Sequence, residues 1–502
     1  MTLHPDSRQS WGFFFSWRIS SWSRPNSSSS NSRSKQHHKI PEFASFLRNI
    51  TLMSLLLLGS IGSISCSGPI SSSSNSSSST RWVSSSSSFG GALAMTTTPS
   101  AVMRPRDPVL SPVVIVPGTG GNQLEAKLTE DYKASSPWCY TLKKDYFRLW
   151  LDLVTLFPPF TSCFADRLAL EYDPLTDQYN NAKGVETRVP YFGTTESMEY
   201  LDPSFKSISA YMIQLVNELT SKGYEKGRSL FGAPYDFRYA PGPRASKVAV
   251  EYQKDLKSLI EHAYTTNNKE PVVLVSHSMG CLWTLYFLNQ QPMEWRHKFV
   301  AHFVTIAAPW GGVVEQMMTF ASGNPEGVPF VNPLVIRKEQ RSSESNLWLL
   351  PVSWTFGLRP LVITSSRSYT AADMEEFLND IGYPEGIAPY RSRIPHLTEV
   401  LEAPKVPITL IYGFGVPTAE TLSYDSKGFD YIPKIEMGDG DGTVNVCSLT
   451  AVISDWKNTQ GQSLDVIAFP KKGHMKILQD KEALEVIVNT ILNARPQQQL
   501  VV

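Results

Sequence analysis

The sequence lacks a charge excess of either sign. Lysine and arginine together number 46, and so do aspartate and glutamate, so the formal net charge is zero. Proteins that bind nucleic acid normally carry a basic excess, so nucleic acid is not an expected partner. Hydrophobic residues make up 41% of the 502 residues, which is enough for a large core.

A hydrophobic run long enough to span a membrane comfortably is also missing. The best candidate, FLRNITLMSLLLLGSIGSIS (46–65), has a short apolar centre at Leu52–Leu58 and then becomes rich in glycine and serine. A span needs about 20 apolar residues. The basic residues Lys39 and Arg48 before the centre and the small residues after it are typical of a secretory signal segment.

Serine dominates the first 106 residues, with runs at 27–30, 71–79 and 84–88. Such tracts bury too little apolar surface to offset the entropy of ordering, so we expect this leader to be disordered. The part before the hydrophobic segment, Met1–Ser45, is rich in arginine and serine and poor in acids. Three interpretations remain open: a secretory signal read from a downstream start such as Met53, an uncleaved signal anchor, or an organelle transit peptide.

N-glycosylation sequons are absent between Arg106 and Val502, and those present (Asn26, Asn49 and Asn75) lie in the leader. The folded part is therefore not expected to carry N-linked glycan, even in a secretory compartment. No internal repeat is visible.

From Pro112 onwards, short β-rich runs alternate with helical patterns. The expected strands are 111–118, 271–276, 298–309, 406–415 and 463–470, and the expected helices are 204–224, 245–264, 280–289 and 481–494. This alternation predicts a mostly parallel, doubly wound α/β sheet in one domain, 107–502. The span 311–403 fits poorly and reads as a long irregular insertion, either a lid or a surface excursion without a role.

The expected strand 271–276 ends in the sequence S-H-S-M-G, which runs into an apolar helix. A nucleophilic serine in an α/β hydrolase sits on such a sharp strand-to-helix turn, G-x-S-x-G, where the flanking residues must be tiny. Here Ser276 stands at the first glycine position, and it is small enough for the turn to survive. The motif predicts that Ser278 is the nucleophile, whereas an ordinary polar turn is the alternative.

Two further groups follow in the chain order that a Ser-Asp-His triad requires. The turn GDGDG offers Asp439 and Asp441, and His474 comes just after the last expected strand. A serine hydroxyl needs a base to take its proton, and the base needs a carboxylate to fix its tautomer. Ser278, His474 and one of the two aspartates supply these roles.

The tetrahedral intermediate of acyl transfer also needs backbone donors. One comes from the residue after the nucleophile, here Met279, and one from the loop after an early strand. That loop is PGTGGNQ (117–123), in which Thr119 is the expected second donor. The proposed chemistry calls for neither a metal ion nor an organic cofactor.

Several motifs together resemble the lecithin:cholesterol acyltransferase (LCAT) and lysosomal phospholipase A2 family, and within it the plant LCAT-like 1 group most closely. The resemblance runs in order from about Pro112 to Ile491. Its motifs are VIVPGTGGNQLEAKL, WCYTLKKDYFRLWLDL, GAPYDFR, SHSMGCL, APWGG, FASGNPEGVP, KEQRSSESNLWLLP, LIYGFGVPT and GDGDGTVN.

The resemblance implies an α/β-hydrolase fold with a small membrane-binding subdomain (about 132–170), a cap and a lid loop (about 311–403). It implies attack on a phospholipid ester to give an acyl-serine, whose acyl group passes to water or to a lipid hydroxyl such as a sterol. The site residues that it implies are the nucleophile Ser278, the acid Asp441, the base His474 and the oxyanion amides of Thr119 and Met279. Asp441 is thereby chosen over Asp439, which becomes a turn residue.

The resemblance also pairs Cys139 with Cys163 in a disulfide that closes the membrane-binding subdomain. The loop between them is rich in apolar side chains that are costly to leave in water, so contact with a membrane or substrate is expected, with packing on the core as the alternative. The candidates for this contact are Trp150, Leu151, Leu156 and Phe157. The plasma member of the family has a second disulfide. The resemblance does not extend to it, because Cys447 has no evident partner. Cys281 is expected to be a free, buried thiol.

The expected function is therefore that of a phospholipase or lipid O-acyltransferase acting at a phospholipid surface, in the secretory pathway or outside the cell. A signal-anchored or organellar enzyme is the alternative location. A catalytically silent lipid-binding protein on the same fold is the alternative function, supported only by Ser276 and by the unfamiliar leader. Water and a sterol attack the same acyl-enzyme, so the triad does not report the acceptor, and the sn-1 or sn-2 preference is equally hidden.

Overall fold

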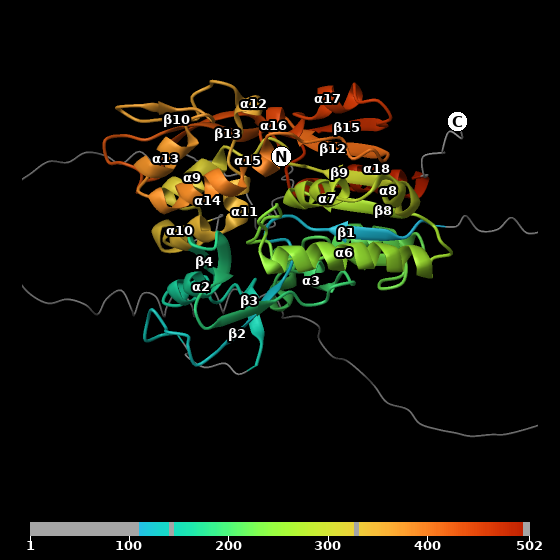
Figure 1. Ribbon diagram of the computed structural model, residues 1–502, viewed down its shortest axis with the longest axis horizontal. Coiled ribbons are helices and arrows are strands. Elements are labelled where there is room, and N and C mark those ends of the chain that lie inside the picture. The colour runs from blue at the N-terminus through green and yellow to red at the C-terminus, as the bar shows by residue number, and fades with distance from the viewer. Residues whose placement is uncertain (1–109, 140–144, 326–330, 495–502) are drawn as a thin grey trace, which may run out of the picture. The chain divides into compact units, whose positions relative to one another are not determined.

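The computed structural model describes residues 110–139, 145–325 and 331–494 (Figure 1). The serine-rich leader and its hydrophobic segment at 46–65 lie outside the described residues. Within the ranges that are described, no helix combines the length and the apolar character needed to cross a bilayer.

A six-stranded sheet in which every pairing is parallel forms the centre of the fold, in the order β15-β12-β9-β8-β1-β7. Its strands are β1 (Val113–Val116), β7 (Leu230–Gly232), β8 (Val272–His277), β9 (Val300–Ile306), β12 (Ile408–Phe414) and β15 (Leu464–Pro470). Every residue of β1, β8 and β9 is buried, as expected for parallel strands that are covered on both faces. The predicted α/β class with a mostly parallel sheet is confirmed.

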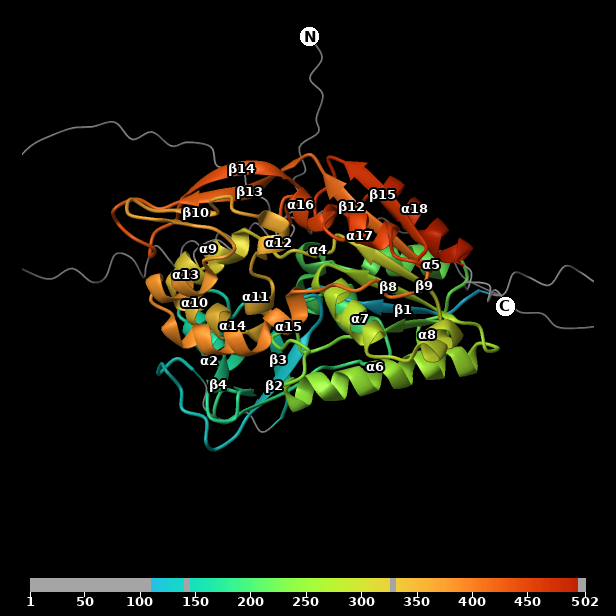
Figure 2. The same cartoon turned by 45° about the horizontal axis from the view of Figure 1, so that its top comes forward.

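Helices cover both faces of this sheet. Helices α6, α7 and α8 pack on one face and α5 and α18 on the other (Figure 2). Their bounds are α5 (Ile213–Ser221), α6 (Lys247–Thr266), α7 (Met279–Asn289), α8 (Met293–Phe299) and α18 (Lys481–Asn493). Ser246 caps α6 by accepting a hydrogen bond from the Ala249 amide at 3.2 Å, and Asp480 caps α18 in the same way. Helix α7 is apolar on all sides, which suits its position inside the core.

Two expected elements differ from the structure. The run 298–309 divides, because α8 ends at Phe299 and β9 begins at Val300. The helix expected at 204–224 is broken into η1 (Pro203–Phe205), α4 (Lys206–Ser209) and α5. The break occurs because the backbone at Tyr211 donates to the Glu199 carbonyl instead of continuing the helix. This detour brings the Tyr211 side chain towards the end of β8.

A small antiparallel region follows β1, and the sequence pattern did not predict its strands. It contains the disulfide between Cys139 and Cys163. Its elements are β2 (Leu124–Leu128), β3 (Phe147–Trp150), α2 (Thr161–Leu168), β4 (Leu170–Asp173), β5 (Gln178–Asn181), β6 (Val185–Arg188) and α3 (Glu196–Glu199).

Short helices make up about half of the span 311–403, which is therefore less irregular than expected. Its helices are short, at most ten residues, and they escape detection because a brief apolar pattern broken by proline and glycine resembles a loop. They are α9 (Glu315–Ser322), α10 (Pro333–Ser342), α11 (Glu344–Trp348), α12 (Ser353–Phe356), α13 (Met374–Asp380), η2 (Pro384–Gly386), α14 (Ile387–Arg393) and α15 (Pro395–Thr398).

A second sheet of four strands, in the order β11-β10-β13-β14, packs on α9 (Figure 2). Its strands are β10 (Val362–Ile363), β11 (Ser368–Tyr369), β13 (Val416–Ser423) and β14 (Lys434–Gly440). The hairpin β13–β14 follows the expected strand 406–415, in a stretch for which the sequence pattern predicted no strand, and it ends next to Asp441. The remaining elements are α16 (Val446–Leu449), α17 (Ile453–Lys457) and η3 (Lys476–Leu478).

Candidate active site

Ser278 stands between the last residue of β8 and the first residue of α7. Its backbone has φ 54° and ψ −130°, a conformation that costs a non-glycine residue about 1–3 kcal/mol. The Ser278 amide donates to the Ile306 carbonyl at 2.8 Å, which ties the turn to the neighbouring strand β9. The side chain is half-buried and lines a cavity at the carboxyl end of the sheet.

The residues around this turn are small because backbone from the β1 loop passes close by. A Cβ added to Gly280 would lie 2.3 Å from the Pro117 carbonyl oxygen, and one added to Gly118 would lie 2.8 Å from the Ser278 Cβ. Ser276 occupies the first glycine position of the motif, and the turn accommodates its hydroxyl. Its Oγ lies 2.8 Å from Thr284 Oγ1, so the buried polar group has a partner.

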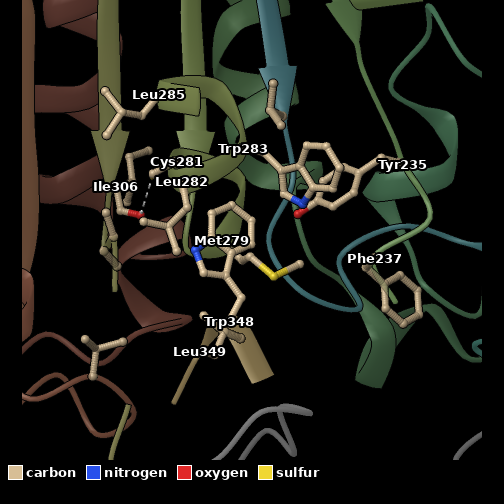
Figure 3. Packing of buried hydrophobic residues seen from close by; sticks show 14 of the residues in the cluster. Tyr235, Phe237, Met279, Cys281, Leu282, Trp283, Leu285, Ile306, Trp348 and Leu349 are labelled. Atoms are coloured by element: carbon tan, nitrogen blue, oxygen red, sulfur yellow. Dashed lines mark hydrogen bonds between the residues drawn. The ribbon is translucent and has the colours of Figure 1, made fainter. Parts of the chain in front are cut away.

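The helix after the serine is fixed by large side chains (Figure 3). The Trp283 ring lies 5.3 Å from the Tyr235 ring and 6.1 Å from the Trp348 ring, measured between centroids. The Cys281 thiol is free and buried, as expected, and donates to the Ser276 carbonyl at 3.2 Å. Burial raises the pKa of the Cys281 thiol, which makes it a packing group.

The structure brings together the three side chains that the sequence selects. The His474 Nε2 lies 3.0 Å from Ser278 Oγ, and the His474 Nδ1 lies 2.7 Å from Asp441 Oδ2. His474 and Asp441 are buried. The backbone joins them as well, because the His474 amide donates to the Asp441 carbonyl at 2.7 Å.

Of the two aspartates, Asp441 belongs to the hydrogen-bonded series with His474 and Ser278, and Asp439 does not. Asp441 Oδ1 accepts from the amides of Thr443 and Val444 at 3.0 and 2.7 Å, which orients the carboxylate towards His474. Asp439 lies within β14, and its Oδ1 accepts from the Gly415 amide at 2.6 Å. Asp439 therefore holds the start of β13 to the end of β14.

The two amides expected to bind an oxyanion belong to Thr119 and Met279. Within the described residues neither amide donates to another protein group. The Thr119 hydroxyl lies 3.2 Å from Met279 Sδ, so the two residues adjoin. Thr119 lines the cavity together with Ser278. The Met279 amide begins α7, where the helix dipole favours negative charge.

The sequence did not predict that Tyr211 and His277 form a buried hydrogen-bonded pair next to the triad. The Gly118 amide donates to the Tyr211 hydroxyl at 2.9 Å, and this hydroxyl lies 2.8 Å from His277 Nδ1. The His277 Nε2 lies 3.1 Å from the His474 carbonyl, so a neutral ring with its proton on Nε2 satisfies every contact. Burial lowers the pKa of His277 well below its ordinary value, with a smaller contribution from His474. The only signal in the sequence is the histidine before Ser278.

We expect Tyr211→Phe to lower the free energy of unfolding by about 2–4 kcal/mol, because it leaves the Gly118 amide and the His277 Nδ1 buried without a partner. Urea unfolding followed by circular dichroism measures this change. Tyr264→Phe is the matched control, since no hydrogen bond to the Tyr264 hydroxyl is found in the described part of the chain. An equal loss in both variants would contradict this role of the Tyr211 hydroxyl.

Two cavities adjoin each other at this end of the sheet, and the serine lines one of them. The first is lined by Ser278, His474 and residues of α9, and the second shares Thr119, Asn324 and Asn346 with it. The second is mostly apolar. It takes in three of the four side chains expected to contact a membrane or substrate, namely Trp150, Leu151 and Leu156.

These loop side chains face inward. Leu151 and Leu156 are buried, and Trp150 Nε1 donates to the Gly120 carbonyl at 2.7 Å. Phe157 is half-buried. In the described part of this region, the large apolar side chains that face outward are instead Trp138, 63% exposed, and Val154, 56% exposed.

Among the described residues, no cluster of histidine, cysteine, aspartate and glutamate side chains is arranged to hold a metal ion. The titratable groups at the site are Ser278, His474, Asp441 and the residues next to them. Chemically, this arrangement can move a proton from a hydroxyl to an imidazole and form an ester at the serine oxygen.

Comparison with known proteins identifies the family to which this chain is similar. The family model described as "Lecithin:cholesterol acyltransferase" matches residues 146–389 and 383–481. The chain is similar to lecithin-cholesterol acyltransferase-like 1 of Arabidopsis thaliana, with 49% identity over 392 residues, which cover 76% of this chain and 89% of that protein.

Two animal relatives match the same part. Lysosomal phospholipase A and acyltransferase of Canis lupus familiaris is 39% identical over 382 residues, 76% of this chain and 91% of its own length. Phosphatidylcholine-sterol acyltransferase of Papio anubis is 36% identical over 392 residues, 77% of this chain and 86% of its own. The family resemblance seen in the motifs is thereby confirmed, and the chain belongs to the lecithin:cholesterol acyltransferase family.

Proposed function

We propose that the protein is a lipid acyltransferase or phospholipase that cleaves a glycerophospholipid ester through an acyl-serine at Ser278. The observation that carries this proposal is the hydrogen-bonded series from Ser278 Oγ through His474 to Asp441 at the base of a cavity. Membership of the acyltransferase family supports the lipid substrate.

In the first half of the reaction, His474 Nε2 takes the proton of Ser278 as Oγ attacks the ester carbonyl. The amides of Thr119 and Met279 donate to the oxyanion of the tetrahedral intermediate. The intermediate collapses, the carbon–oxygen ester bond breaks, and His474 gives its proton to the departing lysolipid alcohol. Asp441 stabilises the imidazolium and keeps the ring in the tautomer that accepts at Nε2.

In the second half, an acceptor hydroxyl gives its proton to His474 and attacks the acyl-serine. The bond between the acyl carbon and Ser278 Oγ then breaks, and His474 returns the proton to Oγ. Water as acceptor gives a fatty acid, and a sterol or another lipid alcohol gives an ester. The apolar second cavity next to Thr119 supports binding of an acyl chain or a lipid acceptor within reach of the serine.

We assign membrane contact to the small region at about 132–170, with the exposed side chains of Trp138 and Val154 entering the interface. The helical span 311–403 is assigned as cap and lid, since α9 and Asn346 line the cavity of the serine. The disulfide supports an oxidising compartment, so we place the enzyme in the secretory pathway or outside the cell, associated with membranes.

The catalytically silent alternative receives no support from the site. Ser276 was its main argument, and the hydroxyl of Ser276 pairs with Thr284 without disturbing the turn. A silent protein also has no need to hold three polar groups in a proton-transfer series.

The experiment that tests this function supplies labelled phosphatidylcholine liposomes to the purified protein, with and without sterol. We expect labelled fatty acid and lysolipid without sterol, and sterol ester in addition when sterol is the acceptor. A fluorophosphonate probe should label the native protein and spare Ser278→Ala. Absence of both lipid cleavage and probe labelling would overturn the proposal.

A further inference from the structure

The cavity that contains Ser278 has a polar wall that the steps above do not use. Helix α9 contributes Glu315, Gln316 and Thr319 to this wall, and Asn324 follows the helix. Carboxyl and carboxamide groups are unfavourable neighbours for an acyl chain, because burying them without partners costs free energy. This wall therefore suits a polar part of the substrate.

Thr319 and Asn324 use their polar groups within the protein, whereas Glu315 and Gln316 keep hydrogen-bonding capacity for a ligand. Glu315 Oε1 accepts one hydrogen bond, from Asn324 Nδ2 at 3.1 Å. In the described residues no lysine, arginine or histidine forms an ion pair with Glu315. Gln316 Nε2 is buried without a hydrogen-bond partner among the described groups. A buried amide donor without a partner is rare in native structures. Because Gln316 also lines the cavity, a rotation of its carboxamide brings this donor to a ligand bound there.

We propose that Glu315 and Gln316 form a binding subsite for the phosphate-bearing alcohol that leaves when Ser278 is acylated. This proposal rests on the proposed function and deepens it. The Gln316 amide donates to a phosphate or ester oxygen of the lipid, and the Glu315 carboxyl does the same when it is protonated. An ionised Glu315 repels the phosphate instead.

The charge of Glu315 changes in the physiological range. Burial raises the pKa of Glu315 to about 7, against the smaller opposing effects of the Asn324 hydrogen bond and the charge of His474. Below pH 7 the carboxyl is mostly neutral and can donate a hydrogen bond, and above pH 7 it is mostly anionic. Preference for a phosphate-bearing substrate is therefore expected to be high below pH 7 and to fall above it.

The other titratable groups that line this cavity do not produce the same change of substrate preference with pH. From the same cavity these are Tyr211, His277 and His474. Burial raises the pKa of Tyr211 above its ordinary value and lowers that of His277, so both stay neutral across this range. His474 acts on every ester substrate, so its contribution cancels when two substrates are compared.

Among the residues that the structure describes, the charged groups on the elements packed against α9 are paired, exposed or placed in the second cavity. On α10, Arg337 pairs with Asp430, Arg341 donates to backbone carbonyls, Glu339 lines the second cavity and Lys338 is exposed. On β13, Glu420 pairs with Arg359.

The test compares kcat/KM for phosphatidylglycerol, whose headgroup carries the phosphate charge without a compensating cation, with that for a phosphate-free 4-nitrophenyl ester of the same fatty acid. Both are presented in the same nonionic micelles between pH 5 and pH 9. For the native protein we expect the ratio to fall roughly tenfold around pH 7, the scale of two like charges several ångström apart in a partly buried site. Glu315→Gln should make the ratio independent of pH, and Glu315→Asp should keep a fall.

Two further variants complete the comparison. Glu294→Gln changes an exposed glutamate on α8 and should follow the native curve. Gln316→Leu should lower the ratio at every pH, and it tests the subsite if Glu315→Gln does not fold. A native ratio without a fall, or a fall kept in Glu315→Gln, overturns the subsite. Loss of Ser278-dependent cleavage of both esters would instead overturn the proposed function.

Discussion

Replacing Ser278 by alanine is expected to lower acyl release from phosphatidylcholine by roughly 10⁶-fold, the loss found when the nucleophile of a serine protease triad is removed. The variant loses only Oγ. Its Cβ stays, so the close approach of Gly118 and the packing of α7 are unchanged. The lost contact is the hydrogen bond to His474, and its net contribution to stability is about 1 kcal/mol.

Ser276→Ala is the matched control, because Ser276 lies two residues earlier and has its own hydrogen bond with Thr284. We expect Ser276→Ala to keep its activity and Ser278→Ala to lose it, while both bind liposomes as the native protein does. Acyl release, circular dichroism and liposome co-sedimentation measure these properties. Continued deacylation by Ser278→Ala would show that the nucleophile lies elsewhere.

The central sheet and the triad candidates could be predicted because their signals are local. Strand β1 is wholly apolar and strand β8 is apolar over its first four residues, and each runs directly into a loop of small residues. The serine turn follows from local sterics, since Gly280 has no room for a side chain next to Pro117. The choice of Asp441 over Asp439 came from the family resemblance, since both aspartates stand in the same glycine-rich run.

Features that depend on distant contacts could not be predicted. Tyr211 reaches His277 only because the chain leaves the helical pattern at Ala210, where backbone pairing with Glu199 and Leu201 replaces helical hydrogen bonds. Glu315 resembles any first-turn glutamate of a helix until the cavity around it is seen. The inward orientation of Leu151 and Leu156 is likewise set by packing, which hydrophobicity alone does not specify.

The two aspartates near β14 provide the second large prediction. Asp441→Asn is expected to lower kcat by about 10⁴-fold, the loss seen when the same change is made in a Ser-His-Asp protease. The new side chain can keep accepting from the amides of Thr443 and Val444 through its oxygen. Its NH₂ group then faces His474 Nδ1 and donates to it, which forces the ring proton onto Nε2. A protonated Nε2 cannot take the proton of Ser278.

Asp439→Asn is the control for this variant, because it makes the same chemical change two residues away. Its oxygen can still accept from the Gly415 amide, so the junction of β13 and β14 stays closed and most of the activity should remain. Steady-state kinetics on phosphatidylcholine, with unfolding curves for both variants, separates a tautomer effect from a loss of stability. Equal losses of kcat in the two variants would mean that Asp441 orients no base and that the carboxylate partner of His474 has been misassigned.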